Sequence, residues 1–229
     1  MTLLNDPIAE GVLSELHRQD QQQFWSIVMH FLPAVARRLL LRKNFNLKDR
    51  DATFLRDKLA AIDRAKGELA YSFCRALQAH RAVEVGTSFG VSTIYLAAAI
   101  RDNAATSAVP GQVIGSEIET EKVRAARANI ERAGLTDFVE IREGDALEKL
   151  RDCGGPVDFL LLDTWIPLVR PAIELIAPQL RSGAIVLCDN VKQFEKEYRD
   201  FTDYVRHPAN GFRSMLWPGQ GGLEISVKA

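Results

Sequence analysis

The sequence predicts an α/β fold built on a doubly wound, mostly parallel sheet. After His80, short apolar runs alternate with helical segments, which is typical of parallel strands joined by crossover helices. The predicted strands cover residues 82–85, 113–116, 139–141, 159–162 and 185–188. The tail GFRSMLWPGQGGLEISVKA alternates around Pro-Gly and Gly-Gly turns, which predicts an antiparallel hairpin at the edge of the sheet. Together these segments predict a seven-stranded sheet.

Helical signals precede and connect the strands. Residues 1–50 predict a helical extension, because apolar residues recur at helical spacing between Phe24 and Leu39, although Pro33 should kink or break that helix. A second amphipathic helix is expected over residues 53–79, with interruptions near Asp63 and Gly67. A third should start at Thr120 as its cap and end at Gly134.

The length allows one domain beyond this extension. At 229 residues and 47% hydrophobic content, residues 51–229 are expected to form a single catalytic domain. The extension is expected to cover the core or a subunit interface, with an active-site lid as the alternative. Its apolar stripe makes a homodimer the expected assembly.

Composition argues for a small-molecule partner. Twenty-nine Lys and Arg balance thirty Asp and Glu, so no excess charge indicates a nucleic-acid or anionic-membrane partner. Three cysteines outside any CxxC pattern argue against a disulfide framework or a zinc site and favour a reducing cytoplasm. The first residues lack the basic-then-apolar order of a secretory signal. The early apolar stretch is interrupted by charges and a proline, so no membrane span is expected.

Candidate ligand-binding residues follow the predicted strands, where open α/β sheets bind their ligands. The segment EVGTSFGVS places Gly86 and Gly90 in a turn before a helix, which suits a close ligand, although a plain tight turn is the alternative. Their Gly-x-x-x-Gly spacing differs from the Gly-x-Gly-x-x-Gly motif, which argues against a dinucleotide-binding site. Glu117 can accept ribose hydroxyls or be a solvated loop residue, and Gly144-Asp145-Ala146 can contact an adenine edge.

Five segments of the sequence, taken in their order along the chain, resemble the class I S-adenosylmethionine-dependent O-methyltransferases. They are AVEVGTSFGVSTIYLA, SEIE, EGDA, LLLDTW and CDNV. More narrowly, they are similar to the metal-dependent catechol and caffeoyl-CoA O-methyltransferases over about residues 65–229. The resemblance implies a Rossmann-like fold and S-adenosylmethionine as methyl donor. It places Gly86, Ser88 and Ser92 at the methionine end of the donor, Glu117 at the ribose, and Asp145 with Ala146 at the adenine. The remaining residues of the implied donor site are Glu84, Thr87, Ile118, Gly144, Asp163 and Trp165.

Two acids close the last two parallel strands. VDFLLLD ends in Asp163 and AIVLCDN ends in Asp189 and Asn190, so adjacent strands would place these side chains at one edge. Two carboxylates and an amide oxygen suit magnesium, manganese or calcium, and the resembling family holds such a metal with the corresponding trio. The alternative is that both aspartates cap following helices. We expect the metal, with Asp163 shared between it and the donor site.

One family feature is absent. Catechol-type members carry a lysine base directly after Asp-x-Trp, whereas Ile166 follows Trp165 here. Lys192 is the candidate replacement, because a lysine near a cation can have a lowered pKa, with an ordinary surface lysine as the alternative. Trp165 can wall the adenine or acceptor pocket, or be a core aromatic.

The expected function is therefore methyl transfer from S-adenosylmethionine to a hydroxyl of a small, aromatic acceptor, assisted by a divalent cation. The alternatives are a metal-independent methyltransferase with a different acceptor and a non-catalytic descendant that binds the cofactor or a partner protein. An NAD-dependent oxidoreductase is disfavoured by the glycine spacing and the two strand-end aspartates. The acceptor itself depends on loops and on the extension, which vary independently of the fold.

Overall fold

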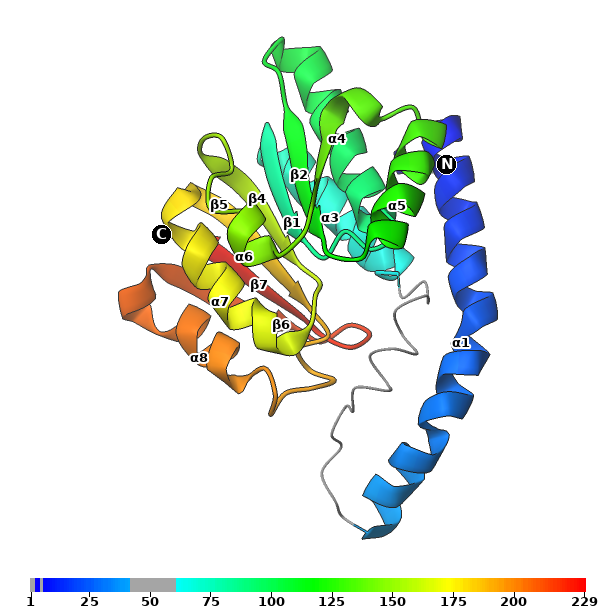
Figure 1. The fold of residues 1–229 in the computed structure, drawn as a ribbon. Coiled ribbons are helices and arrows are strands. Elements are labelled where there is room, and N and C mark those ends of the chain that lie inside the picture. The colour runs from blue at the N-terminus through cyan, green and yellow to red at the C-terminus, as the bar shows by residue number, and fades with distance from the viewer. Residues whose placement is uncertain (1–2, 5, 42–60) are drawn as a thin grey trace.

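The computed structural model describes residues 3, 4, 6–41 and 61–229. A seven-stranded sheet with the strand order β3-β2-β1-β4-β5-β7-β6 forms its centre (Figure 1). Its strands are β1 (Arg81–Val85), β2 (Gln112–Glu117), β3 (Val139–Glu143), β4 (Val157–Leu162), β5 (Leu180–Asp189), β6 (Phe212–Trp217) and β7 (Leu223–Lys228). Each predicted strand lies within an observed one, so the predicted fold class is confirmed.

The direction of the strands also agrees with the prediction. Strands β3, β2, β1, β4 and β5 are parallel to their neighbours. The C-terminal hairpin then adds β7 antiparallel to β5, and β6 antiparallel to β7. All five parallel strands therefore end at one edge of the sheet, which is where the predicted site residues lie.

Helices cover both faces of the sheet. The start of α1 (Pro7–Leu41), α3 (Arg64–Ala76), α4 (Val91–Ser107) and α5 (Thr120–Arg132) pack on one face. The opposite face carries α6 (Ala146–Lys149), α7 (Ile166–Ile176) and α8 (Arg199–Arg206). Three short 3₁₀ turns, η1 (Thr136–Phe138), η2 (Ala177–Gln179) and η3 (Pro208–Asn210), join these elements.

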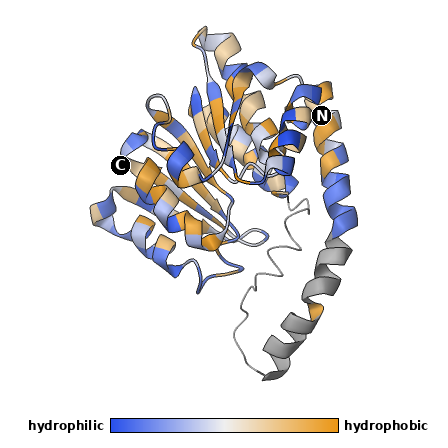
Figure 2. Ribbon diagram, viewed as in Figure 1, coloured by the Kyte–Doolittle hydropathy of each residue, from blue (hydrophilic) through white to orange (hydrophobic). Residues whose placement is uncertain are grey.

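Alternation along the strands creates these two hydrophobic layers. Ala82 packs into the core under α3 and α4, whereas its neighbour Val83 packs into the core under α7. The central strands are buried on both faces, so they read as nearly continuous apolar runs. Figure 2 shows this concentration of hydrophobic residues along the strands.

Helix α5 ends as predicted but starts differently. Gly134 follows its last turn with a φ of +69°, which is the usual left-handed end of a helix. The predicted cap at Thr120 is wrong: Glu119 is the N-cap and makes no side-chain cap bond. The Thr120 hydroxyl instead donates a 2.5 Å hydrogen bond to Glu143 Oε1 at the end of β3.

Two of the predicted helix interruptions, a break at Pro33 and an interruption at Gly67, are wrong, whereas residues 61–63 are not helical, as predicted near Asp63. Helix α1 continues through Pro33, because a proline removes one main-chain hydrogen bond and the ladder on either side can carry the helix past it. Helix α3 starts after its cap Asp63 and runs through Gly67, where a Cβ would lie 2.4 Å from the Tyr95 ring. The glycine is therefore a packing contact. Residues 53–60 of the predicted helix, and the predicted domain boundary at 50, lie outside the described residues.

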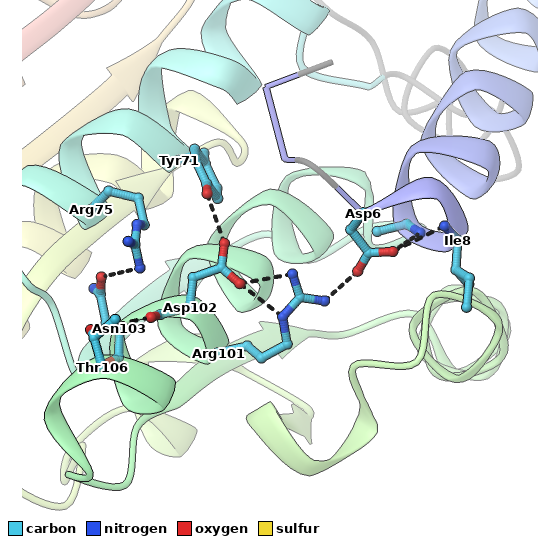
Figure 3. Close-up of polar contacts among 9 residues, drawn as sticks. Asp6, Ile8, Tyr71, Arg75, Arg101, Asp102, Asn103 and Thr106 are labelled. Carbon is cyan, nitrogen blue, oxygen red and sulfur yellow. Dashed lines mark hydrogen bonds and ion pairs between the residues drawn. The ribbon is translucent and has the colours of Figure 1, made fainter. Parts of the chain in front are cut away.

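The first turns of α1 belong to the main core. Leu13 and Leu16 are buried with residues of α4 and α5. A polar network at the start of the helix adds to this packing (Figure 3): Arg101 on α4 pairs with Asp6 and also donates 2.8 and 2.9 Å hydrogen bonds to Asp102. Tyr71 on α3 donates to the other oxygen of Asp102 at 2.7 Å. The start of α1 is thus part of the domain.

Among the described residues, none of the helices combines the length and the apolar character needed to cross a membrane.

Candidate active site

The turn after β1 lies at the carboxyl edge of the sheet and is tied to its neighbours. Gly86 N and Thr87 N both donate to Ser116 O near the end of β2, at 3.1 and 3.0 Å. Gly86 has a φ of +98°, and a Cβ there would lie 2.1 Å from the main-chain oxygen of Asp163. Only glycine allows the turn to approach β4 so closely. The predicted Gly-rich turn is therefore present, with α4 starting directly behind it.

Glu117 joins the second strand end to this turn. Its Oε2 accepts a 2.8 Å hydrogen bond from Ser88 N, and its Oε1 accepts from Ile118 N and Glu119 N, both at 2.9 Å. The carboxylate is 8% exposed. These contacts hold Glu117 at the carboxyl edge of the sheet. Its predicted contact with a ribose stays a prediction. Ile118, beside it, is exposed and offers an apolar surface at the same edge.

The third strand end carries the predicted adenine contacts. Gly144 N donates to Glu117 O at 2.9 Å, which brings this turn next to the second strand end. Asp145 is exposed and caps the short helix α6, accepting from Leu147 N at 2.8 Å, while Ala146 is buried. The structure thus brings three strand ends together in the order that the sequence predicted.

A small pocket opens between the first turn, the end of β4 and the residues that precede α3. Its lining consists of Ala61, Ile62, Gly86, Thr87, Ser88, Phe89, Val91, Ser92 and Asp163. Five of these residues belong to the predicted donor site. Ala61 and Ile62 were not predicted, because they precede the first strand and carry no motif; only the packing of α3 brings them here.

Glu84 lies in β1, two residues before the Gly86 turn that lines this pocket. It is fully buried in β1 and accepts a 2.5 Å hydrogen bond from Thr93 Oγ1 on α4. Loss of solvent raises the pKa of this carboxyl, and the neighbouring hydroxyl groups of Ser92, Thr93 and Thr87 oppose that rise. The structure therefore places Glu84 as a support between β1 and α4.

Asp163 and Asp189 lie side by side. Strands β4 and β5 pair Leu162 with Cys188, so the next residue on each strand is an aspartate at the same level. Loss of solvent, followed by the negative charges of Asp189 and Glu84, raises the pKa of Asp163 to about 8. Burial also raises the pKa of Asp189, which is 4% exposed. The crevice thus brings two carboxyl groups together in a poorly solvated place, where their ionised forms are costly unless a positive charge neutralises them.

Asn190 completes the predicted metal trio. Its main-chain N donates to Asp189 Oδ1 at 2.7 Å, and its Nδ2 donates to Asp189 Oδ2 at 3.3 Å. Its φ of +61° is left-handed, an uncommon conformation for a residue other than glycine and one that is enriched at functional sites. The structure therefore brings the three predicted ligands together.

The alternative that the two aspartates cap helices finds no support in the geometry. The N-cap of α7 is Trp165, which makes no side-chain cap bond, and Asp163 lies two residues before it. After Asp189 the chain forms turns, and α8 starts only at Arg199. A hard-oxygen donor set in an excess of buried negative charge fits a divalent cation. Among the described residues, no three His, Cys, Asp or Glu side chains are placed so that they could hold a metal ion, so the set needs the Asn190 amide oxygen.

Lys66 is a further site residue that was not predicted from the sequence. It lies on α3, is 2% exposed, and forms an ion pair with Asp189 Oδ1. Its Nζ also lies 3.5 Å from Asp63 Oδ2 at the start of the same helix. A single lysine in an amphipathic helix carries no sequence signal for burial, and its partner lies 123 residues further along the chain.

The predicted lysine substitute is placed differently. Lys192 is exposed, and its Cβ lies 2.3 Å from where a Cβ of Gly222 would be. Ile166, which stands where the family lysine is expected, packs against the core under α7. Trp165 is 47% exposed at the start of α7, so it is available to wall a pocket and is not a core aromatic.

The chain is similar to known methyltransferases. A family model described as a methyltransferase domain matches residues 83–191. The catechol O-methyltransferase of Mycobacterium tuberculosis is 33% identical over 136 residues, which cover 57% of each protein. The catechol O-methyltransferase of Niastella koreensis is 31% identical over 161 residues, 68% of this chain and 70% of that one. The match therefore spans between about half and about two thirds of these relatives.

A solved structure shares the fold. The O-methyltransferase from Bacillus cereus, in complex with S-adenosylhomocysteine (SAH), aligns with a TM-score of 0.65 and 22% sequence identity. The alignment covers 74% of this chain and 83% of that one. At this identity the likeness concerns the fold alone.

Proposed function

Because this chain belongs to the class I S-adenosylmethionine-dependent O-methyltransferase family, we propose that it transfers a methyl group from S-adenosylmethionine to a hydroxyl of a small aromatic acceptor, assisted by a divalent cation. The observation that carries this proposal is the meeting of the Gly86 turn, Glu117, Asp163 and Asp189 at one edge of the sheet. The two catechol O-methyltransferases similar to this chain support a hydroxylated aromatic acceptor.

The methyl donor is proposed to occupy the pocket beside the Gly86 turn. The N-terminus of α4 offers main-chain N–H groups and the positive end of its dipole, which suit the donor's carboxylate. Glu117 is proposed to accept a ribose hydroxyl at Oε2, which accepts one main-chain N–H group, whereas Oε1 already accepts two. Asp145, Ala146, Ile118 and Trp165 are the proposed neighbours of the adenine.

Asp163, Asp189 and Asn190 would hold the cation. When bound, magnesium, manganese or calcium would supply positive charge that favours the ionised form of the acceptor hydroxyl. Asp163 also lines the donor pocket, so one side chain would align both halves of the reaction. This shared position makes Asp163 the proposed catalytic residue of the site.

The reaction itself requires alignment. The acceptor oxygen forms a bond to the methyl carbon while the carbon–sulfur bond breaks, and the electron pair of that bond remains on sulfur. The chain's contribution is to hold the two reactants in line, which is worth several orders of magnitude in rate. The hydroxyl proton must leave the acceptor. Ile166 has no group that can take this proton, so we propose that the neutral amine form of exposed Lys192 takes it and then releases it to solvent.

A metal-independent methyltransferase with a different acceptor is the second candidate. Two observations favour it: Ile166 replaces the expected base, and Lys66 already pairs with Asp189. In that case the Lys66 ammonium would provide the positive charge at the crevice. The small-molecule acceptor, a homodimer and a cytoplasmic location remain part of the proposal in both cases.

The decisive experiment is a titration followed by a transfer assay. Calorimetric binding of S-adenosylmethionine, then transfer of its labelled methyl group to a panel of catechols and phenols with and without magnesium, tests each part separately. Magnesium-dependent methylation of a catechol supports the leading proposal, and transfer without any cation supports the second candidate. Donor binding without transfer to any acceptor indicates a non-catalytic descendant.

A further inference from the structure

Lys66 is a buried cation at the edge of the proposed metal site. Lysine is almost never fully buried unless it is paired, because removing its charge from water is costly. Here the side chain is 2% exposed and meets two carboxylates, Asp189 and Asp63. The pair with Asp189 is itself buried, since that carboxylate is 4% exposed.

The ammonium lies close to the other proposed ligand as well. A Cβ at Gly221, in the β6–β7 turn, would lie 2.5 Å from Asn190 Oδ1 and 3.5 Å from Lys66 Nζ. The amide oxygen and the ammonium therefore border the same small space, with Asp189 bonded to both residues. Gly221 has a φ of +69° and no Cβ, so no side chain fills that space.

We propose that Lys66 determines which cation charge the site accepts: its fixed ammonium offsets part of the negative charge of Asp189 and Asp163, so that a divalent ion is favoured over a trivalent one. This proposal rests on the proposed function, because it assumes that Asp163, Asp189 and Asn190 bind a cation. It makes Lys66 a specificity-determining residue that acts through Asp189 without itself touching the acceptor.

The physical argument is Coulombic. A fixed positive charge a few ångströms from a cation site repels every cation, and the repulsion energy is proportional to the charge of the ion. The repulsion of a trivalent ion is therefore about 1.5 times that of a divalent ion. Low exposure keeps solvent screening small at this position. By contrast, a loss of ligand orientation after mutation weakens binding of both ions alike. The ratio of the two affinities therefore isolates the charge of Lys66 from its structural contribution.

The experiment is a pair of calorimetric titrations of the metal-free protein, with manganese(II) and with terbium(III), for the wild type, Lys66→Met and Lys66→Arg. We expect the terbium-to-manganese affinity ratio to rise by about tenfold or more in Lys66→Met. Lys66→Arg keeps the charge and should keep the wild-type ratio. Lys149→Met, an exposed lysine on α6, is the matched control and should also keep it.

A Lys66→Met variant that fails to fold is replaced by the double variant Lys66→Met with Asp189→Asn, compared with Asp189→Asn alone. Removing both partners of a buried pair is better tolerated than removing one. The double variant should again show the higher ratio, because only the ammonium differs. A ratio that stays within twofold of its reference overturns the proposal while leaving the cation site intact. A wild type that binds neither ion overturns both this proposal and the metal-assisted part of the proposed function, whereas donor binding and transfer would still be measured separately.

Discussion

Glu117 at the end of β2 accepts a 2.8 Å hydrogen bond from the main-chain N of Ser88 in the turn after β1. Its other oxygen accepts two further main-chain N–H groups. One buried carboxylate thus fixes the relative position of two strand ends. The same side chain is the proposed partner of the donor's ribose, so its loss should affect both the shape and the affinity of the donor pocket.

We expect Glu117→Ala to weaken binding of S-adenosylhomocysteine by about 1.5–3 kcal/mol, the range for a hydrogen-bonded charged group. Isothermal titration calorimetry measures this directly. Glu121→Ala, at an exposed position on α5, provides the matched control and should bind like the wild type. Equal affinity in Glu117→Ala and the wild type would remove Glu117 from the donor site.

The pattern of the strands explains why this edge could be predicted. Alternating apolar runs are local signals, and the ends of parallel strands must share an edge, so residues such as Glu117, Asp163 and Asp189 could be placed together from the sequence alone. The strand register determines their exact position: because Leu162 pairs with Cys188, the two aspartates that follow lie at the same level.

Contacts that depend on packing between distant elements could not be predicted. Burial of Lys66 depends on how α3 lies against the end of β5, and the helix periodicity alone does not encode that position. Thr120 is a preferred cap residue, but the nearby Glu143 side chain on β3 binds its hydroxyl instead. In both cases a contact with a residue far along the chain determines the side chain's position, which local sequence preference does not specify.

The raised pKa of Asp163 predicts a pH dependence of stability. Because the folded-state pKa lies above the unfolded value of 3.8, the protonated form favours the folded protein. That contribution is fully present below about pH 4 and is lost as the pH rises towards about 8. The free energy of unfolding of the metal-free wild type, relative to Asp163→Asn, should therefore decrease between pH 5 and pH 8.

Urea denaturation at several pH values measures this difference. Asp137→Asn, which alters an exposed carboxylate in η1, serves as the control and should give a curve parallel to that of the wild type. A wild-type curve that runs parallel to that of Asp163→Asn would show that Asp163 does not have the raised pKa.

Because the first turns of α1 pack in the core, truncating a buried residue there should lower stability without affecting the donor site. Leu13 is completely buried in the core, so Leu13→Ala should lower the free energy of unfolding by about 2–5 kcal/mol. Affinity for S-adenosylhomocysteine, measured below the unfolding transition, should remain unchanged, because the predicted donor residues all follow Ala82.

Leu32→Ala is the matched control within the same helix. Leu32 is 50% exposed, so its truncation should change the unfolding free energy by less than about 0.5 kcal/mol. Light scattering on this variant also tests the proposed homodimer: if the exposed Leu32 side chain lies in the interface, the mass should shift towards that of the monomer. Equal destabilisation by the two substitutions would contradict the docking of the first turns described above.

The cation gives the sharpest prediction, because it separates the leading function from its alternatives. If Asp163, Asp189 and Asn190 hold a divalent ion, an excess of chelator should abolish methyl transfer while leaving donor affinity largely intact. Asp189→Ala should behave like chelation, since removal of one of two carboxylates weakens the charge that offsets the ion's reluctant dehydration. Asp163→Ala should be worse, because it also alters the donor pocket. Asp203→Ala, at an exposed position on α8, should retain wild-type transfer. Transfer at full rate in excess chelator would instead exclude the metal-assisted mechanism and establish the metal-independent candidate.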